Sequence, residues 1–114
     1  RRVYTIERYR TLMKAAEERF AAQRLTNIVT RIGDGSVGWP EQAPFDRIIL
    51  TASAPTRPDA ILEQLKDGGI AVAPVDRETR QVLVRYVREG DSITETDIMD
   101  VRFVPLVKGE ARAL

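Results

Sequence analysis

The sequence predicts an α/β fold, a doubly wound sheet of parallel strands that ends in antiparallel edge strands. Apolar, β-branched runs alternate with segments of helical periodicity over residues 3–75. Such alternation implies right-handed crossovers and a parallel sheet covered on both faces. After residue 75, only "DRETR" separates two strand-like runs. A parallel crossover needs about a dozen residues or more, so this connection predicts a hairpin.

The first two strands are predicted to flank an amphipathic helix. "VYTIE" (3–7) is a short β-branched and aromatic run, which is typical of a strand. Residues 8–25 repeat apolar side chains at helical spacing, with Lys, Arg and Glu on the opposite face. "NIVTRI" (27–32) predicts the second strand, and the loop "GDGSVGWPEQAP" (33–44) follows it.

Two further strands and a second helix complete the parallel part of the prediction. "FDRIILTAS" (45–53) predicts a strand in which "IIL" is continuous enough to be buried on both faces. A helix is expected over 58–66, because its proline suits a first turn and the Gly-Gly pair at 68–69 suits a C-terminal stop. "GIAVAPV" (69–75) predicts the fourth strand.

The C-terminal third is predicted to be antiparallel. "QVLVRYVRE" (81–89) follows the short connection, and "GD" at 90–91 turns the chain into the strand-rich stretch 92–107. Pro105 marks an edge strand, where a missing N–H is harmless. No repeat, linker or low-complexity segment divides the chain, so residues 1–114 are expected to form part of one domain.

Composition excludes several classes of function. Eighteen basic residues against seventeen acidic ones argue against nucleic acid or an anionic membrane as the main partner. The chain has no Cys and no His, which removes thiolate chemistry, the commonest zinc ligand and the Ser-His-Asp triad. We expect no metal site. No apolar run approaches the ~18 residues that span a bilayer, and no signal peptide opens the chain. A cytoplasmic protein is the expectation.

Polar and glycine residues follow the predicted parallel strands at their carboxyl ends. In open parallel sheets ligands bind outside these ends. Glu7 ends the first strand, Asp34 lies between two glycines after the second, and Thr51 begins the polar segment after the third. An acid at such a position accepts hydrogen bonds from ribose hydroxyls in nucleotide-binding versions of this architecture. Glycines beside Asp34 let the backbone approach a flat ring.

Each of these residues also has a plain structural interpretation. A single acid after a strand, such as Glu7, more often caps a helix or faces solvent. "GDG" is a common turn, and Trp39 serves equally well as core or loop packing. The argument for a binding site depends on the joint placement of these residues at one edge of one sheet.

Four longer segments resemble the protein-L-isoaspartate O-methyltransferase family. They are "TIER", "NIVTRIGDGSVGWPEQAPFDRIILTASAP", "LEQLKDGGIAVAPV" and "VRFVPLVKGEA". The likeness runs from about Val3 to Gly109. It implies a Rossmann-like, S-adenosyl-L-methionine-dependent methyltransferase sheet and a role in protein repair. By position in these motifs, Glu7 is expected to bind the cofactor ribose.

The resemblance also implies the other site residues. Asp34 and Gly35 resemble the pair that contacts adenine. Thr51 and Ala52 resemble part of the wall that faces the methionine end of the cofactor and the substrate. The late segment beside the peptide substrate is implied to be Val104, Pro105 and Leu106. Asp76 departs from the glycine that usually follows "PV", which changes the details of that loop.

The implied reaction needs no acid or base from the chain. The substrate is the carboxylate of an L-isoaspartyl residue, which is ionised at pH 7 because its unperturbed pKa is about 4. The leaving group is a neutral thioether. Catalysis then consists of positioning and desolvation, and no catalytic residue is assigned in a chain without His or Cys.

Family members begin with a substrate-binding segment, a strand and a Gly-rich G-x-G-x-G loop, and this sequence starts after that point. We therefore expect a C-terminal part of the methyltransferase domain, inactive by itself. A second hypothesis is a standalone module that completes its sheet by self-association through an exposed strand edge. A nucleotide-binding oxidoreductase is a third, but the chain lacks G-x-G-x-x-G between a strand and a helix.

Overall fold

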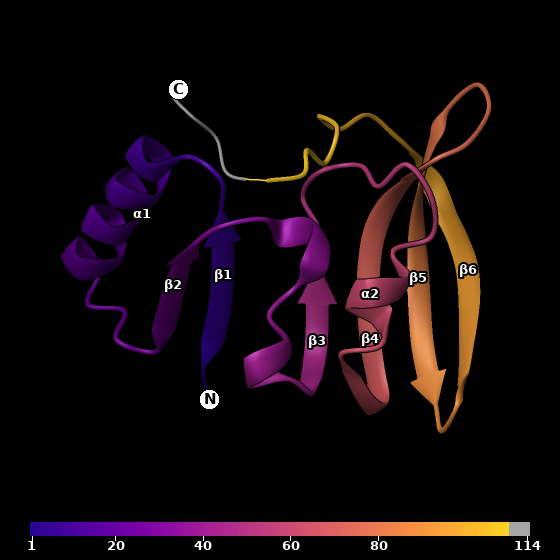
Figure 1. The fold of residues 1–114 in the computed structure, drawn as a ribbon, viewed down its shortest axis with the longest axis horizontal. Coiled ribbons are helices and arrows are strands. Elements are labelled where there is room, and N and C mark those ends of the chain that lie inside the picture. The colour runs from indigo at the N-terminus through magenta and orange to yellow at the C-terminus, as the bar shows by residue number, and fades with distance from the viewer. Residues whose placement is uncertain (110–114) are drawn as a thin grey trace. The chain divides into compact units, whose positions relative to one another are not determined.

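The fold is α/β, as the sequence predicts, in a computed structural model that describes residues 1–109 (Figure 1). The chain divides into two compact units, one of Arg1–Gly35 with the residues from Val107 onward, and one of Ser36–Leu106. The predicted domain 1–114 extends beyond the described residues at 110–114. Within residues 1–109 no helix has the length and apolar character needed to cross a membrane.

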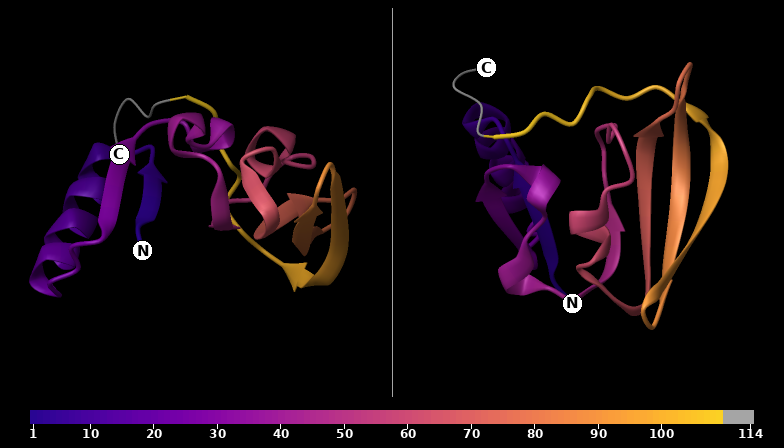
Figure 2. Two further views of the ribbon diagram at one scale, coloured as in Figure 1. Left: turned by 90° about the horizontal axis from the view of Figure 1, so that it is seen from below. Right: turned by 45° about the vertical axis from the view of Figure 1, so that its right-hand side comes forward.

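The first unit contains the predicted strand, helix and strand. β1 (Val3–Glu7) and β2 (Ile28–Ile32) pair in parallel, and α1 (Arg10–Ala22) connects them. The helix lies along one face of the two strands (Figure 2) and buries Met13 against them. It is shorter than the expected 8–25, because Tyr9 is still extended and the chain turns into the left-handed region at Arg24 (φ 59°).

The second unit is a four-stranded sheet with strand order β3-β4-β5-β6. Its elements are β3 (Phe45–Ile49), α2 (Asp59–Leu62), β4 (Leu65–Asp76), β5 (Gln81–Glu89) and β6 (Ser92–Val101). β3 and β4 are parallel, and the other two pairs are antiparallel. The structure thus confirms the predicted hairpin and antiparallel end. The loop before β3 contains two 3₁₀ turns, Gly35–Val37 and Pro40–Gln42.

The core of the second unit lies between α2 and one face of the sheet. Small and large residues alternate across β4 and β5, since Ala71 faces Tyr86 and Ala73 faces Val84. This pairing leaves room for the two apolar side chains of α2, Ile61 and Leu62. The remaining buried members of this core are Leu50, Leu65, Val75 and Val82.

The predicted helix over 58–66 is mostly wrong. α2 has a single turn, and β4 already begins at Leu65, where it pairs with Phe45. The glycines predicted to stop the helix instead lie inside β4. Gly69 approaches the carbonyl oxygen of Phe45 so closely that a Cβ atom would lie 3.1 Å from it. Strand pairing over the buried Leu65 therefore outweighs the local helical pattern.

Two predicted strands are shorter than their apolar runs. The strand expected over 45–53 ends at Ile49, and that side chain is 73% exposed, which contradicts burial on both faces. Successive residues of a strand point to opposite faces, so Ile48 packs on the core while Ile49 does not. The stretch 92–107 is a strand only as far as Val101, with an isolated bridge at Pro105.

The strands form two hydrogen-bonded sheets, β1-β2 and β3-β4-β5-β6, rather than one continuous ladder. Glu7, Asp34 and Gly35 therefore belong to the first unit, whereas Thr51, Ala52 and Val104–Leu106 belong to the second. The candidate site is described below unit by unit.

Candidate functional site

In the first unit, the ends of β1 and β2 bring Glu7 and Asp34 to the same edge. The two strands are in register to their last residues, with Glu7 opposite Ile32. The N–H of Gly33 then donates a 3.0 Å hydrogen bond to the carbonyl oxygen of Glu7. Asp34 follows directly, half-buried. Parallel pairing thus aligns the two acids that the sequence singled out.

The Glu7 carboxylate supports both interpretations that the sequence left open. Its Oε2 atom accepts the backbone N–H of Arg8 at 2.7 Å and that of Tyr9 at 3.4 Å. These contacts stabilise the turn that leads into α1, because the N–H groups before a helix lack intrahelical partners. Its Oε1 atom has no hydrogen-bond partner within residues 1–109. One oxygen of a half-buried carboxylate thus stays available to a ligand hydroxyl.

Space remains beside the backbone that follows Asp34. A Cβ atom built on Gly35 would meet no atom within 4 Å. Gly33, on the other side of Asp34, is buried. A flat ring can therefore approach the Gly35 backbone, which fits the adenine contact that the family resemblance implies.

In the second unit, Gln64 binds the backbone of the loop that precedes β3. Its buried side-chain amide accepts the N–H of Trp39 at 2.9 Å and donates to the carbonyl oxygen of Val37 at 2.8 Å. Gly38, between them, has φ 65°, and a Cβ atom there would lie 2.6 Å from Nε2 of Gln64. Sequence reasoning missed Gln64, because no local pattern marks a contact across 25 residues.

Thr51 and Ala52 lie between two points of attachment to β4. The N–H of Leu50 donates to Val72 at 3.0 Å, and that of Ala54 donates to Pro74 at 2.8 Å. Thr51 is exposed and Ala52 is half-buried. The segment that follows β3 is therefore anchored on both sides while Thr51 itself faces outward.

Ser53 joins this segment to the predicted substrate segment. Its N–H donates to the carbonyl oxygen of Val104 at 2.7 Å, and its own carbonyl oxygen accepts the N–H of Leu106 at 2.8 Å. These two bonds form a parallel bridge between Ser53 and Pro105. Neither bond uses the nitrogen of Pro105, which fits the expected edge position of that proline.

Asp76, the residue that departs from the family pattern, has a defined partner. The hydroxyl of Ser53 donates a 2.7 Å hydrogen bond to Oδ1 of Asp76. The N–H of Asp76 also donates to the carbonyl oxygen of Ala54 at 2.8 Å. The carboxylate therefore helps fix the segment after β3 to the end of β4, a role that glycine has no side chain to perform.

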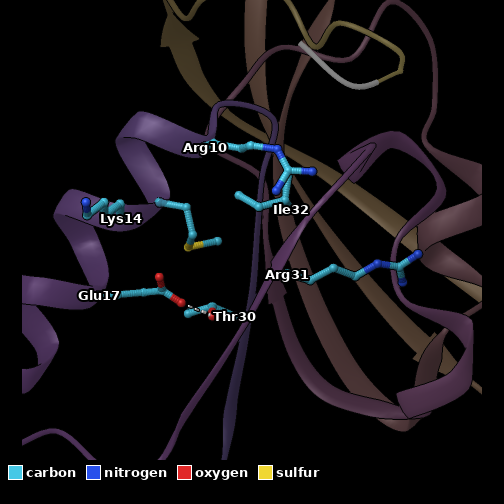
Figure 3. A pocket seen from close by; sticks show the side chains of 7 residues that line it. Arg10, Lys14, Glu17, Thr30, Arg31 and Ile32 are labelled. Atoms are coloured by element: carbon cyan, nitrogen blue, oxygen red, sulfur yellow. Dashed lines mark hydrogen bonds between the residues drawn. The ribbon is translucent and has the colours of Figure 1, made fainter. Parts of the chain in front are cut away.

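A separate hollow of about 440 Å³ lies between α1 and β2 in the first unit (Figure 3). Arg10, Lys14 and Glu17 of α1 line one side, and the hydroxyl of Thr30 on β2 donates to Oε2 of Glu17. Glu7, Asp34 and Gly35 do not line it. The hollow is thus distinct from the strand-end residues that the sequence predicted.

Comparison with known proteins identifies the family. The family model described as protein-L-isoaspartate(D-aspartate) O-methyltransferase (PCMT) matches residues 1–111. A protein-L-isoaspartate O-methyltransferase of Maricaulis maris is 86% identical over the whole chain, which covers 54% of that relative. One of Caulobacter sp. (strain K31) is 56% identical over 98% of the chain and 52% of the relative. The chain thus spans about half the length of these relatives.

Solved structures show the same fold. A protein-L-isoaspartate O-methyltransferase superposes with a TM-score of 0.83 at 24% identity, over 91% of this chain and 33% of that one. A putative Plasmodium falciparum protein of the same name, in complex with S-adenosyl-L-homocysteine, gives 0.82 at 23% identity, over 94% and 53%. The arrangement of strands is consistent with a Rossmann-like fold. The chain belongs to the protein-L-isoaspartate(D-aspartate) O-methyltransferase family.

Proposed function

We propose that the complete protein carrying this chain is an S-adenosyl-L-methionine-dependent methyltransferase that repairs damaged proteins by methylating L-isoaspartyl carboxylates. Family membership supports the reaction. The observation that carries the assignment to this chain is the alignment of Glu7 and Asp34 at the paired ends of β1 and β2. Ligands of open parallel sheets bind at such ends.

The residues present fit the cofactor. Oε1 of Glu7 is available to accept from ribose hydroxyls, and the open side of Gly35 suits a flat ring. When bound, the cofactor supplies the methyl group. The carboxylate of the substrate is already ionised at pH 7, so no side chain of the chain has to remove a proton. Thr51, Ala52 and the Val104–Leu106 segment would orient the substrate and exclude water.

The chain by itself is expected to be inactive. Aligning two reactants contributes roughly 7–11 kcal/mol of barrier lowering only when both are held together.

The cytoplasmic location expected from the sequence stays a prediction, which cell fractionation would check.

Titration with S-adenosyl-L-homocysteine tests the proposal. In the complete protein, we expect Glu7→Gln to weaken binding about 10- to 100-fold, since a hydrogen bond to a charged group contributes about 1.5–3 kcal/mol. The amide oxygen of glutamine can still accept from Arg8 and Tyr9, so the entry into α1 is kept. Glu18→Gln, on the exposed face of α1, is the matched control.

Two results would overturn the proposal. One is unchanged binding in Glu7→Gln, which would leave Glu7 as a helix-capping residue only. The other is a complete protein that binds the cofactor product yet transfers no methyl group to an isoaspartyl peptide, with the normal aspartyl peptide as the negative control.

The second candidate function is a module that self-associates. No described strand pairs with the second edge of β1, and an unpaired edge is a template for another strand. This observation keeps the interaction hypothesis open for the isolated chain, and its test is given in the Discussion.

A further inference from the structure

We propose that Gln81 is a positioning residue for the substrate segment Val104–Leu106. It acts through a pair of hydrogen bonds to the backbone of Phe103. This inference rests on the proposed function, because it assigns to Gln81 a role in how the methyltransferase holds its peptide substrate.

The side-chain amide of Gln81 replaces a strand neighbour at the point where β6 ends. Gln81 is the first residue of β5 and lies opposite Val101, the last residue of β6. Its Nε2 donates to the carbonyl oxygen of Phe103 at 3.2 Å, and its Oε1 accepts the N–H of the same residue at 2.6 Å. A primary amide can donate and accept hydrogen bonds at the same time, as a peptide group does. The pairing of β5 with its neighbour is thereby extended past the end of β6.

The next residues pass directly to the bridge with Ser53. Val104 and Leu106 contribute the two backbone bonds of that bridge, and Ser53 is itself held by its hydroxyl bond to Asp76. The substrate segment thus follows a residue held by the Gln81 side chain and is itself held by the Ser53 backbone.

Little else holds the segment. Val104 is 70% exposed and Phe103 is 38% exposed, whereas Leu106 packs partly against the core. With so little apolar area buried, the hydrogen bonds decide where the backbone lies. The Gln81 anchor is made by a side chain, to the residue just before this segment, so a single substitution removes it.

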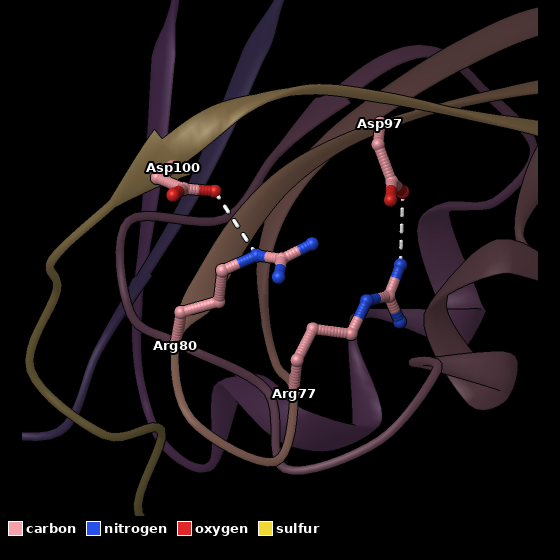
Figure 4. Close-up of polar contacts among 4 residues, drawn as sticks. All are labelled: Arg77, Arg80, Asp97 and Asp100. Carbon is pink, nitrogen blue, oxygen red and sulfur yellow. Dashed lines mark hydrogen bonds and ion pairs between the residues drawn. The ribbon is translucent and has the colours of Figure 1, made fainter.

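The turn that leads into Gln81 is tied to the strand beside it. In the turn between β4 and β5, Arg77 pairs with Asp97 at 2.9 Å and Arg80 pairs with Asp100 at 3.1 Å (Figure 4). Both acids belong to β6, so the turn is tied to the strand beside it. These pairs are exposed and each contributes little to stability. The start of β5 is held by strand pairing, because Gln81 lies opposite Asp76 on one side and Val101 on the other. The Gln81 amide thus reaches Phe103 from a residue that is paired on both sides.

Kinetics of the complete protein test the proposal. Gln81→Met removes the amide while keeping a side chain of similar length. We expect the KM for an isoaspartyl peptide to rise roughly tenfold, as for the loss of one to two net hydrogen bonds. The kcat and the Kd for S-adenosyl-L-homocysteine should stay within about twofold. Gln81→Glu keeps the acceptor for Phe103 but loses the donor, so its KM should be intermediate. Gln23→Met, after α1, is the matched control.

Amide hydrogen exchange gives a readout that does not depend on activity. In Gln81→Met, the N–H of Leu106 should exchange at least about tenfold faster, because its bond to Ser53 depends on the upstream anchor. Unchanged Leu106 protection, or unchanged KM in an active enzyme, would overturn the positioning role. Equal losses in KM, kcat and cofactor binding would also overturn it, since they indicate general destabilisation. A protein inactive on isoaspartyl peptides in which Leu106 still loses protection would contradict the proposed function while supporting the anchor.

Discussion

Tyr86 places a hydroxyl group in the core of the four-stranded sheet. The residue is fully buried, and its hydroxyl oxygen has no hydrogen-bond partner within the described residues. Burial raises the pKa of this phenol above its ordinary value of 10.0, and the carboxylate of Glu95 acts in the same direction. The folded protein therefore favours the neutral form of Tyr86 more strongly than the unfolded chain does.

Replacing Tyr86 by phenylalanine should leave the complete protein as stable or more stable. The substitution removes an unpaired buried hydroxyl, so we expect the free energy of unfolding at pH 7 to rise by zero to about 1 kcal/mol. Urea denaturation measures the change. A loss of more than about 1 kcal/mol would show that the hydroxyl makes a stabilising contact in the complete protein.

The same tyrosine predicts a loss of stability at alkaline pH. Below pH 10 the phenol is protonated in both states and contributes no pH dependence. Above pH 10 the unfolded chain releases the proton while the folded state retains it, so stability falls as pH rises towards the folded pKa. The decrease between pH 9 and pH 11 should be smaller in Tyr86→Phe than in the wild type.

At the scale of elements, α1 ends in a motif that usually contains glycine. The N–H of Arg24 donates to Ala21 and that of Leu25 donates to Phe20, which is the Schellman pattern. Arg24 occupies its left-handed position with φ 59°, a conformation that costs a non-glycine residue roughly 1 kcal/mol.

Arg24→Gly should therefore stabilise the complete protein by about 0.5–1 kcal/mol. Chemical denaturation would show this as a higher midpoint with an unchanged slope. Gln23→Gly, one residue earlier and outside the left-handed region, is the control and should destabilise. A lower midpoint for Arg24→Gly would show that the arginine side chain contributes more than the backbone conformation costs.

At the scale of the whole molecule, the edge of β1 that no described strand pairs with is where we expect the isolated chain to self-associate. The bonds of Val3 and Glu7 to the β2 side show that odd-numbered residues of β1 face β2. The backbone of Ile6 therefore faces the other edge. We expect the isolated chain to associate at high concentration, as measured by light scattering.

Two proline variants test this edge. Ile6→Pro removes an N–H from the unpaired edge and should lower the association. Thr5→Pro breaks the pairing with β2 instead, so it should unfold the first unit. A wild-type chain that stays monomeric at high concentration would contradict the self-association hypothesis.

The sequence by itself determined the element order, the antiparallel end and the family. Strands β1, β2, β4 and β5 were predicted because their apolar periodicity is local, and the hairpin followed from a connection too short for a crossover. The prediction that Glu7 and Asp34 lie at one edge also followed, since parallel strands in register end together. The strands and the hairpin depend on residues close together in the chain, whereas the shared edge of Glu7 and Asp34 follows from the order strand, helix, parallel strand.

Only the tertiary structure decided the features that depend on distant partners. Leu65 lies in a strand rather than in the predicted helix, because it pairs with Phe45. Ile49 is exposed because only the opposite face of its strand packs on the core. Gln64 and Gln81 carry no local signal, yet each binds backbone groups more than twenty residues away. Hydrogen bonds and burial across such separations depend on how the strands are brought together, which local periodicity does not specify.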